Sequence, residues 1–534
     1  MNTKVAAVLL MGTILVASSH SANGVSRSDS LVYGETGRLD RFDPYTIHEA
    51  SGHRLSDLIF DGLVSPAPGG TYEPALAKSW DVRSAGTEVL VTIKEGITWH
   101  RDEKDSSARH VVDSDDVIAT VRAIKNPSSD IPNRERFSVI KSVRKIGRDK
   151  VLFVFDRAMI DPLRFLMFKI LPEHKLSQTA GLSLDSDFVK RPIGTGPYQF
   201  QKYSKTGEIL LRRNEEYYGR KPKFKAVVMK SYADQNIMAQ SLMFGALDMV
   251  TYVSPRSLDE VVGDKRLKTV PYDALSYSFI AFNHRRSILG KREVRQALSQ
   301  AVNRAEMLEA FFMGRGKLVS GPFAPTSWAY NIDVENRAFS PESAKKNLEK
   351  AGLTDTNRDG VFEFEGRPIS LKFVVPISGE SEILKRIALA YQGYLADVGI
   401  PVELDFQDWN VWKKKILKDH DFDLTVASWS FDDAANVMSL FHSNSIKPWG
   451  NNFIGYSNPA VDSLLTEIAS TSDFDKKRLL SHKLHETLAL EAPYTFLWTL
   501  EHNAAHHSQV KGVSVEPFAF FRYLDKWKKD SDSK

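Results

Sequence analysis

After its first two dozen residues, the chain alternates short strand-like runs with amphipathic helical segments along its whole length. In one strand-like run, Val89, Val91 and Ile93 alternate toward one face. In the helical segment at residues 292–302, apolar side chains recur three, four, seven and eight positions apart, which places them on one face. This alternation predicts an α/β protein with mixed sheets.

The chain has 534 residues, of which 42% are hydrophobic, so it can bury a large core. A chain of this length usually divides into two or more lobes. Its 71 basic and 67 acidic residues nearly cancel, and neither sign forms a long run. Because a dedicated nucleic-acid-binding protein concentrates its basic residues on one surface, we expect no nucleic-acid partner.

Residues 1–22 have the pattern of a secretory signal peptide: Lys4, an apolar run over residues 5–17, and the small and polar residues SSHSA. The apolar run is too short to span a bilayer. The chain contains no cysteine, which excludes disulfides and a lipid-modified amino-terminal cysteine. We therefore expect a cleaved signal peptide and a soluble protein in a bacterial periplasm.

The motifs of several enzyme classes are absent, because the chain has no G-x-S-x-G elbow, no P-loop, no H-E-x-x-H and no cysteine nucleophile. An enzyme is therefore not expected, and no cofactor is assigned. The G-x-G at Gly194 to Gly196 leads through Pro197 into a strand-like run instead of a helix. A tight turn fits this context better than a dinucleotide site.

The loop from Asp355 to Gly360 is similar to the first half of a calcium-binding EF-hand loop, in which oxygens at positions 1, 3 and 5 face the ion. Position 12 is Gly366, which supplies no carboxylate. The incomplete ligand set fits a turn equally well, so calcium stays an open alternative and no metal is assigned. His482 and His485 have no third ligand near them in sequence, and we expect them to be solvated surface histidines.

Residues 428–434, which follow an apolar run, read SWSFDDA and raise a functional question. The adjacent carboxylates of Asp432 and Asp433 suit a helix start, because aspartate accepts hydrogen bonds from free backbone N–H groups at the positive end of the helix dipole. They suit a charged anchor for a ligand as well. The residues alone leave both interpretations open.

A set of short motifs follows the chain in a fixed order. The motifs are Asp43-Pro44, Phe60-Asp61-Gly62-Leu63, Leu76-Ala77-Lys78-Ser79-Trp80, Ile93-Lys94-Glu95-Gly96, Trp99-His100, Gly194-Thr195-Gly196-Pro197-Tyr198, Phe282-Asn283, Val294-Arg295-Gln296-Ala297-Leu298, Ser343-Ala344-Lys345, Asp359-Gly360 and Ser428-Trp429. In order and spacing they resemble the family 5 extracellular solute-binding proteins, the oligopeptide and dipeptide receptors of ABC importers. The resemblance covers about residues 31–522. Two departures are a longer loop at residues 101–110 and Asp113 in place of the usual threonine at a helix start, where it can still act as the cap.

The resemblance implies a two-lobed periplasmic binding protein of type II, cluster C-like, with mixed sheets and an extra subdomain in the first lobe. Its lobes would close on a ligand like a hinge, and the ligand can drive closure only by binding the closed state better. The implied division is a signal peptide at 1–22, a first lobe at 23–72, 191–281 and 493–534, its extra subdomain at 73–190, and a second lobe at 282–492.

The resemblance also implies a ligand site. In peptide-binding members, the strand that matches Ser428 to Ser430, with Trp429 between them, pairs with the peptide backbone. An aspartate three residues after the tryptophan, here Asp432, binds the amino terminus of the peptide. Asp433 is then the expected cap of a helix over residues 434–441.

Two further contacts are implied by the resemblance. In dipeptide-binding relatives, a basic residue on the helix that corresponds to residues 384–392 meets the ligand carboxylate, which points to Arg386 or Lys385. His48 to Ala50 match a loop that lines the peptide in oligopeptide-binding members.

The implied function is capture of short peptides in a cleft between the lobes and delivery to the transmembrane subunits of an ABC permease, by a protein that acts as a monomer. The same scaffold carries nickel complexes, haem or oligosaccharides in other relatives, and Trp409, Trp412 and Trp449 would suit an oligosaccharide. Asp432 favours a peptide.

A secreted hydrolase is a more remote alternative, because no set of nucleophile, base and orienting group is recognisable. An envelope chaperone would instead bind unfolded chains through exposed apolar surface.

Overall fold

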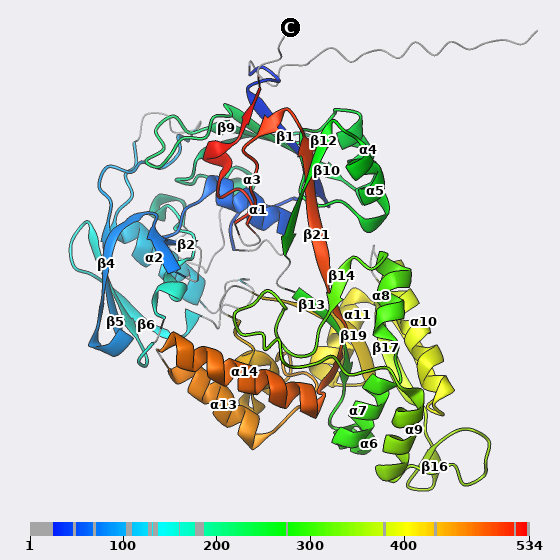
Figure 1. The fold of residues 1–534 in the computed structure, drawn as a ribbon. Helices are drawn as coiled ribbons and strands as arrows, with labels where there is room; N and C mark the ends of the chain where they lie inside the picture. The colour runs from blue at the N-terminus through cyan, green and yellow to red at the C-terminus, as the bar shows by residue number, and fades with distance from the viewer. Residues whose placement is uncertain are drawn as a thin grey trace, which may run out of the picture.

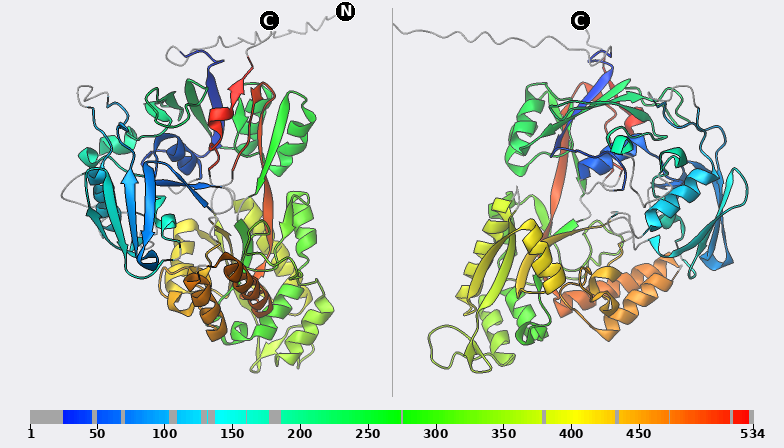
Figure 2. Two further views of the ribbon diagram at one scale, coloured as in Figure 1. Left: turned by 60° about the vertical axis from the view of Figure 1, so that its left-hand side comes forward. Right: turned by 180° about the vertical axis from the view of Figure 1, so that it is seen from behind.

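The structure is a computed structural model that describes residues 25–45, 50–67, 71–102, 109–126, 131, 137–159, 161–176, 186–273, 276–377, 381–431, 435–471, 473–516 and 519–530. The expected signal peptide at residues 1–22 lies outside the described residues. Within the described ranges, no helix is long and apolar enough to cross a membrane. Figures 1 and 2 show two lobes, with the long strand β21 running from one to the other and a smaller sheet at the side of the first lobe.

The first lobe is built on a mixed sheet in which segments from both ends of the chain pair. In spatial order, its strands are β12 (Leu267–Asp273), β21 (Trp498–His507), β11 (Met249–Val250), β1 (Ser30–Thr36), β10 (Ala226–Tyr232), β9 (Ile209–Arg213) and β8 (Tyr198–Tyr203). β1 is parallel to both β10 and β11, whereas β21 is antiparallel to β11 and β12.

This sheet is covered on both faces. Leu31 and Tyr33 of β1 join one core with α1 (Ala50–Ile59). Val32 points to the opposite face and joins a second core with α4 (Gln235–Met243) and α5 (Pro255–Gly263). Figure 1 shows α4 and α5 together on the outer side of the lobe. A strand that is buried on both faces carries consecutive apolar residues, as β1 does from Leu31 to Tyr33.

The smaller sheet at the side of the first lobe is antiparallel. Its strands, in spatial order, are β4 (Ala77–Arg83), β5 (Glu88–Ile93), β7 (Lys150–Phe155) and β6 (Ile140–Lys145). The predicted alternation is confirmed, because Val89, Val91 and Ile93 are buried in a core shared with the first lobe. Asp113 caps α2 (Ser114–Lys125) in a capping box with Asp116, as predicted.

The second lobe is built on a five-stranded mixed sheet within the described residues. In spatial order, its strands are β18 (Val402–Asp408), β17 (Leu371–Ile377), β19 (Leu424–Ser430), β13 (Ser276–Phe282) and β20 (Tyr494–Phe496). Alternate residues of β13 enter two separate cores, with Ile280 on one face and Phe279 on the other. The predicted helix near residue 292 is confirmed as α7, and its apolar stripe is buried.

Helices flank both faces of this sheet. They are α6 (Ser287–Gly290), α7 (Arg292–Gln300), α8 (Arg304–Phe312), α9 (Pro341–Lys350), α10 (Ser381–Asp397), α11 (Trp409–Lys413), α12 (Met438–Phe441), α13 (Pro459–Ser470) and α14 (Phe474–Glu491). Shorter elements elsewhere are β2 (Val64–Ala67), β3 (Thr71–Pro74), α3 (Ser186–Lys190), β14 (Gly316–Leu318), β15 (Glu363–Phe364), β16 (Arg367–Pro368), β22 (Val510–Lys511) and β23 (Lys528–Lys529).

The chain passes between the lobes after β12 and again within β21. Residues 498–500 of β21 pair with β14, and residues 501–507 pair with β12. β13 begins at residue 276 and β20 at residue 494, and both belong to the sheet of the second lobe. The family resemblance implies boundaries at 281/282 and 492/493, which would leave most of β13 and all of β20 in the first lobe, whereas both strands pair in the sheet of the second lobe.

The glycine motif at residues 194–198 is a turn followed by β8, as predicted. A Cβ on Gly194 would lie 1.9 Å from the carbonyl oxygen of Ile59, so no other residue fits against the end of α1. His100 Nδ1 accepts a hydrogen bond from the Gly194 N–H at 3.2 Å, and its Nε2 donates to the Gly196 oxygen at 2.9 Å. Burial lowers the pKa of His100 to about 4. A neutral histidine thus holds the turn in place.

Candidate functional site

The carboxyl ends of β17, β18 and β19 lie at one edge of the second lobe, because β18 and β19 both run parallel to β17. Ser430, the last residue of β19, pairs with Ser276, the first residue of β13. Since β13 follows the passage from β12, the end of β19 lies beside the connection between the lobes. Figures 1 and 2 show this edge on the side of the second lobe that faces the first lobe. In α/β proteins, ligands bind outside the carboxyl ends of such strands.

One side of β19 has no strand partner near this edge. β17 pairs with β19 only at Leu424 and Thr425. From Val426 to Ser430, β19 pairs with β13 on its other side alone, as far as the described residues show. A strand with an unpaired side offers a row of backbone donors and acceptors to another extended chain.

The side chains on this segment divide between the two faces of the sheet. Ser428 and Ser430 are exposed, and Ser428 Oγ lies 2.9 Å from Ser278 Oγ. Trp429 is half-buried, stacks on Phe279 at a centroid distance of 5.8 Å, and donates from Nε1 to the Tyr494 hydroxyl at 3.4 Å. The tryptophan therefore fixes the strand to the core, while the serines face outward.

The expected anchor, Asp432, and its neighbour Asp433 lie outside the described residues. The chain is described up to Phe431, which stacks on Tyr277 at 5.3 Å. The helix that was expected to begin at residue 434 begins at Met438 instead, and its N-cap is Val437, so Asp433 is not its cap. Ala435 has a φ of 48°, a left-handed conformation that cannot belong to the first turn of a helix.

Within the described ranges, no contact joins Ala50, Lys385 or Arg386 to β19. Ala50 is exposed at the start of α1, and His48 lies outside the described residues. Lys385 and Arg386 are exposed on α10. The guanidinium of Arg386 lies over the ring of Phe311 at 4.8 Å, and it faces α8.

Of the three tryptophans considered for an oligosaccharide site, Trp409 lies directly after the carboxyl end of β18 and is 44% exposed. It stacks on Trp412 at 4.9 Å, and Trp412 is buried and donates to Thr425 Oγ1 at 2.9 Å. Trp449 is exposed, and its backbone N–H donates to the backbone oxygen of Leu417. The stacked pair is a rigid aromatic surface at the same edge as the end of β19.

The loop at residues 355–360 makes the internal hydrogen bonds of a turn. Asp355 Oδ2 accepts from the Gly360 N–H at 3.1 Å, and Asn357 Oδ1 accepts from the Asp359 N–H at 3.0 Å. Gly360 has a φ of 86°, a conformation that favours glycine. Among the residues that the structure describes, no three His, Cys, Asp or Glu side chains are grouped so as to hold a metal ion.

The expectation that His485 is a solvated surface residue is wrong. His485 is 0% exposed, and its Nδ1 accepts a hydrogen bond from the Asn331 N–H at 2.9 Å. Its Nε2 is 3.0 Å from Ser320 Oγ. Burial lowers its pKa to about 3. The segment that contains Ser320 and Asn331 covers this side of α14, which a pattern within one helix cannot reveal.

Comparison with known proteins assigns the chain to a family. The sequence model described as "Bacterial extracellular solute-binding proteins, family 5 Middle" matches residues 71–449. The chain belongs to this family. Members of the family are binding proteins, which agrees with the absence of the enzyme motifs noted above.

Individual relatives are similar over nearly their whole lengths. The oligopeptide-binding protein AppA of Bacillus subtilis is 26% identical, and the match covers 96% of this chain and 93% of AppA. The dipeptide-binding protein of Escherichia coli is 24% identical over 96% of this chain and 97% of its own length. Heme-binding protein A of Haemophilus influenzae is 23% identical, and the match covers 97% of this chain and 98% of its own length.

The solved structure of B. subtilis AppA in complex with a nonapeptide has the same fold. Its TM-score against this chain is 0.79, and the match covers 94% of this chain and 99% of AppA. The two-lobed α/β architecture expected from the sequence is therefore confirmed.

Proposed function

We propose that this chain is the periplasmic solute-binding component of an ABC importer, which captures short peptides between its lobes and delivers them to the transmembrane subunits of the permease. In this proposal the signal peptide is removed and the protein acts as a monomer. Family membership supports solute binding. The oligopeptide-binding and dipeptide-binding relatives support a peptide as the solute.

The observation that carries the proposal is the unpaired side of β19 from Val426 to Ser430. Extended peptides add to such an edge through main-chain hydrogen bonds, which do not depend on the side chains of the peptide. This mode suits a receptor that accepts peptides of different sequence.

In this proposal the two ends of the peptide are recognised by charge. Asp432 follows β19 by two residues and binds the free ammonium group of the peptide. In a closed site that excludes water, this pair is strong, and removal of one partner costs about 3 to 5 kcal/mol. Lys385 or Arg386 binds the carboxylate of the peptide, and residues His48 to Ala50 line it from the first lobe.

Identification of the natural ligand tests the proposal. The protein would be purified from the periplasm without unfolding, weighed by native mass spectrometry, and the released ligand sequenced by tandem mass spectrometry. The proposal predicts a complex of one chain with one short peptide. A haem, a metal complex or a saccharide in the same stoichiometry would contradict the peptide assignment while leaving the family assignment intact.

A non-peptide solute is the second candidate. It is favoured by the haem-binding relative and by the exposed face of Trp409 at the edge of the second lobe. A ring stacked on Trp409 would need no hydrogen bonds from β19. Substitution Trp409→Ala would then abolish binding, whereas a peptide held by β19 and Asp432 would keep most of its affinity.

A further inference from the structure

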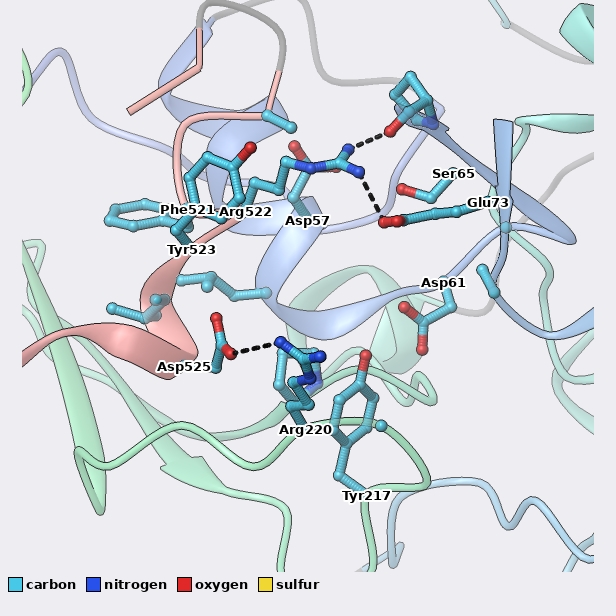
Figure 3. A pocket seen from close by; sticks show the side chains of 18 of the residues that line it. Asp57, Asp61, Ser65, Glu73, Tyr217, Arg220, Phe521, Arg522, Tyr523 and Asp525 are labelled. Atoms are coloured by element: carbon cyan, nitrogen blue, oxygen red, sulfur yellow. Dashed lines mark hydrogen bonds and ion pairs between the residues drawn. The ribbon is translucent and has the colours of Figure 1, made fainter. Parts of the chain in front are cut away.

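A cavity of about 640 Å³ lies within the first lobe and its extra subdomain (Figure 3). Its walls are the end of α1, the β2–β3 hairpin, the loop at residues 217–222 and the carboxyl-terminal segment at residues 519–526. Every described residue that lines it comes from this half of the molecule. The lining therefore includes neither the end of β19 nor any of the residues assigned to the proposed peptide contacts.

Asp61 contributes a carboxylate to the wall of this cavity. It accepts hydrogen bonds from Thr195 Oγ1 at 3.2 Å and from the Tyr218 hydroxyl. Within the described residues it has no ion pair. Lys169 pairs with Asp57 at 2.7 Å, and Lys94 donates to the Ala75 oxygen at 2.5 Å, so both neighbouring cations act on Asp61 only from a distance. Burial raises the pKa of Asp61, which shows that its charge is incompletely balanced.

The other carboxylates of the cavity are paired. Glu73 lies 2.7 Å from Arg522, and Asp525 lies 4.0 Å from Arg220, as the dashed lines in Figure 3 show. Among the carboxylates that line the cavity in the described part of the chain, Asp61 is thus the one without a cation within 4.0 Å.

Aromatic rings form much of the remaining wall. Figure 3 shows Tyr217 with its hydroxyl directed toward Asp61, and Phe521 and Tyr523 across the cavity. Two rings of this cavity already hold ammonium groups of the protein, because Lys526 lies 4.4 Å from the ring centroid of Tyr523 and Lys94 lies 4.8 Å from that of Tyr218. Carboxylates next to aromatic faces are the surroundings that proteins use to bind organic cations.

We propose that this cavity is a second ligand site that binds a small primary amine, with the ammonium group on Asp61 and the carbon chain against Tyr217 and Phe521. The ammonium group would supply the close counter-charge that Asp61 lacks. The cavity volume lies within the range of about 300 to 1,000 Å³ that is usual for small-molecule sites. The site shares no residue with the proposed peptide contacts and binds its amine independently of them.

Isothermal titration calorimetry of the full-length mature protein with n-butylamine tests the proposal. The proposal predicts one butylamine site at neutral pH, and no binding of 1-butanol or butyrate, which have the same chain length without the positive charge. Asp61→Asn should weaken butylamine binding about 100-fold, because a charge-assisted hydrogen bond and an ion pair are lost. Asp475→Asn, at a 79% exposed side chain on α14, is the matched control and should leave the affinity unchanged.

A second variant keeps the proposal testable if Asp61→Asn does not fold. Ser65 lines the cavity on β2, and Ser65→Phe would place a phenyl ring in part of the cavity while the Asp61 carboxylate is kept. This variant should weaken butylamine binding and retain the thermal unfolding midpoint. Equal affinity for butylamine and 1-butanol, or an unchanged affinity in both variants, would overturn the proposal. Asp432→Asn should keep full butylamine affinity, which separates this site from the peptide site.

Discussion

Arg295 has an unusual environment for a charged residue, because its guanidinium is buried and is surrounded by carbonyl groups. It donates to the carbonyl oxygens of Leu289, Gly290, Glu491 and Ala492 at 2.8 to 3.1 Å. These bonds tie the start of α7 to the end of α14. The planar fork of arginine is what allows one side chain to reach all four acceptors.

Substitution Arg295→Lys should therefore destabilise the protein by about 3 kcal/mol, because a single ammonium cannot satisfy the same carbonyl groups and one buried charge is left poorly solvated. Arg292→Lys on the same helix is the control. Arg292 is exposed and makes surface ion pairs, so this change should cost less than about 1 kcal/mol. Urea unfolding of the two variants measures both values, and equal losses would contradict this interpretation of Arg295.

His100 gives a prediction for the dependence of stability on pH. Burial lowers its pKa from 6.5 to about 4 in the folded state. Between these pH values the unfolded state binds the proton more strongly, so the stabilisation is complete above pH 6.5 and is lost as the pH falls toward 4. The loss from this group should approach about 3 kcal/mol.

The measurement is the free energy of unfolding of the native protein and of His100→Gln at several pH values between 7 and about 4.5. Other buried histidines, such as His485, add their own loss in both proteins. The difference between the two proteins isolates His100, and the variant should lose less stability on acidification. If the free energy of unfolding fell equally with pH in the two proteins, His100 would not be the source of the loss.

At the scale of elements, the turn at residues 194–196 joins the first lobe to its extra subdomain. Gly194→Ala should destabilise the protein by more than about 3 kcal/mol, because the new Cβ would lie 1.9 Å from the Ile59 oxygen and the backbone would have to move. Gly263→Ala is the control, since a Cβ at that position in α5 meets nothing within 4 Å. Thermal unfolding should show a lower midpoint for the first variant and an equal or higher midpoint for the second.

Most regular elements could be predicted from local patterns. The alternation in β5, the apolar stripe of α7 and the cap at Asp113 all depend on neighbours in sequence, and all are confirmed. The start of α12 was not predictable, because the left-handed Ala435 delays it. The burial of His485 was not predictable either, because it depends on a distant segment that covers α14.

The candidate site shows the same limit. Residues 428–430 were identified from the sequence, but the unpaired side of β19 results from the point at which β17 stops pairing with it, after Val374 and Thr425. Such a register is a property of the assembled sheet. The cavity at Asp61 was missed for a related reason. Asp61 lies in a motif that was noticed, but its partners come from positions as distant as Thr195 and Tyr218.

At the scale of the whole molecule, the lobes are largely independent bodies. In the described part of the chain, the large hydrophobic cores each belong to one lobe. β21 enters the core of the second lobe with Trp498 and that of the first lobe with Ala504. Two lobes with separate cores and few connecting strands can rotate as units, which is the hinge closure on which the proposed capture of a peptide depends.

The most direct test of that proposal compares one tripeptide with its N-acetylated form by isothermal titration calorimetry. The native protein should bind the free peptide tightly, and Asp432→Asn should weaken this binding by about 3 kcal/mol or more while changing the binding of the acetylated peptide little. Asp433→Asn is the matched control and should leave both affinities unchanged. Equal loss for the free and the acetylated peptide in Asp432→Asn would contradict the account, because Asp432 would then have a structural role and would not bind the amino terminus.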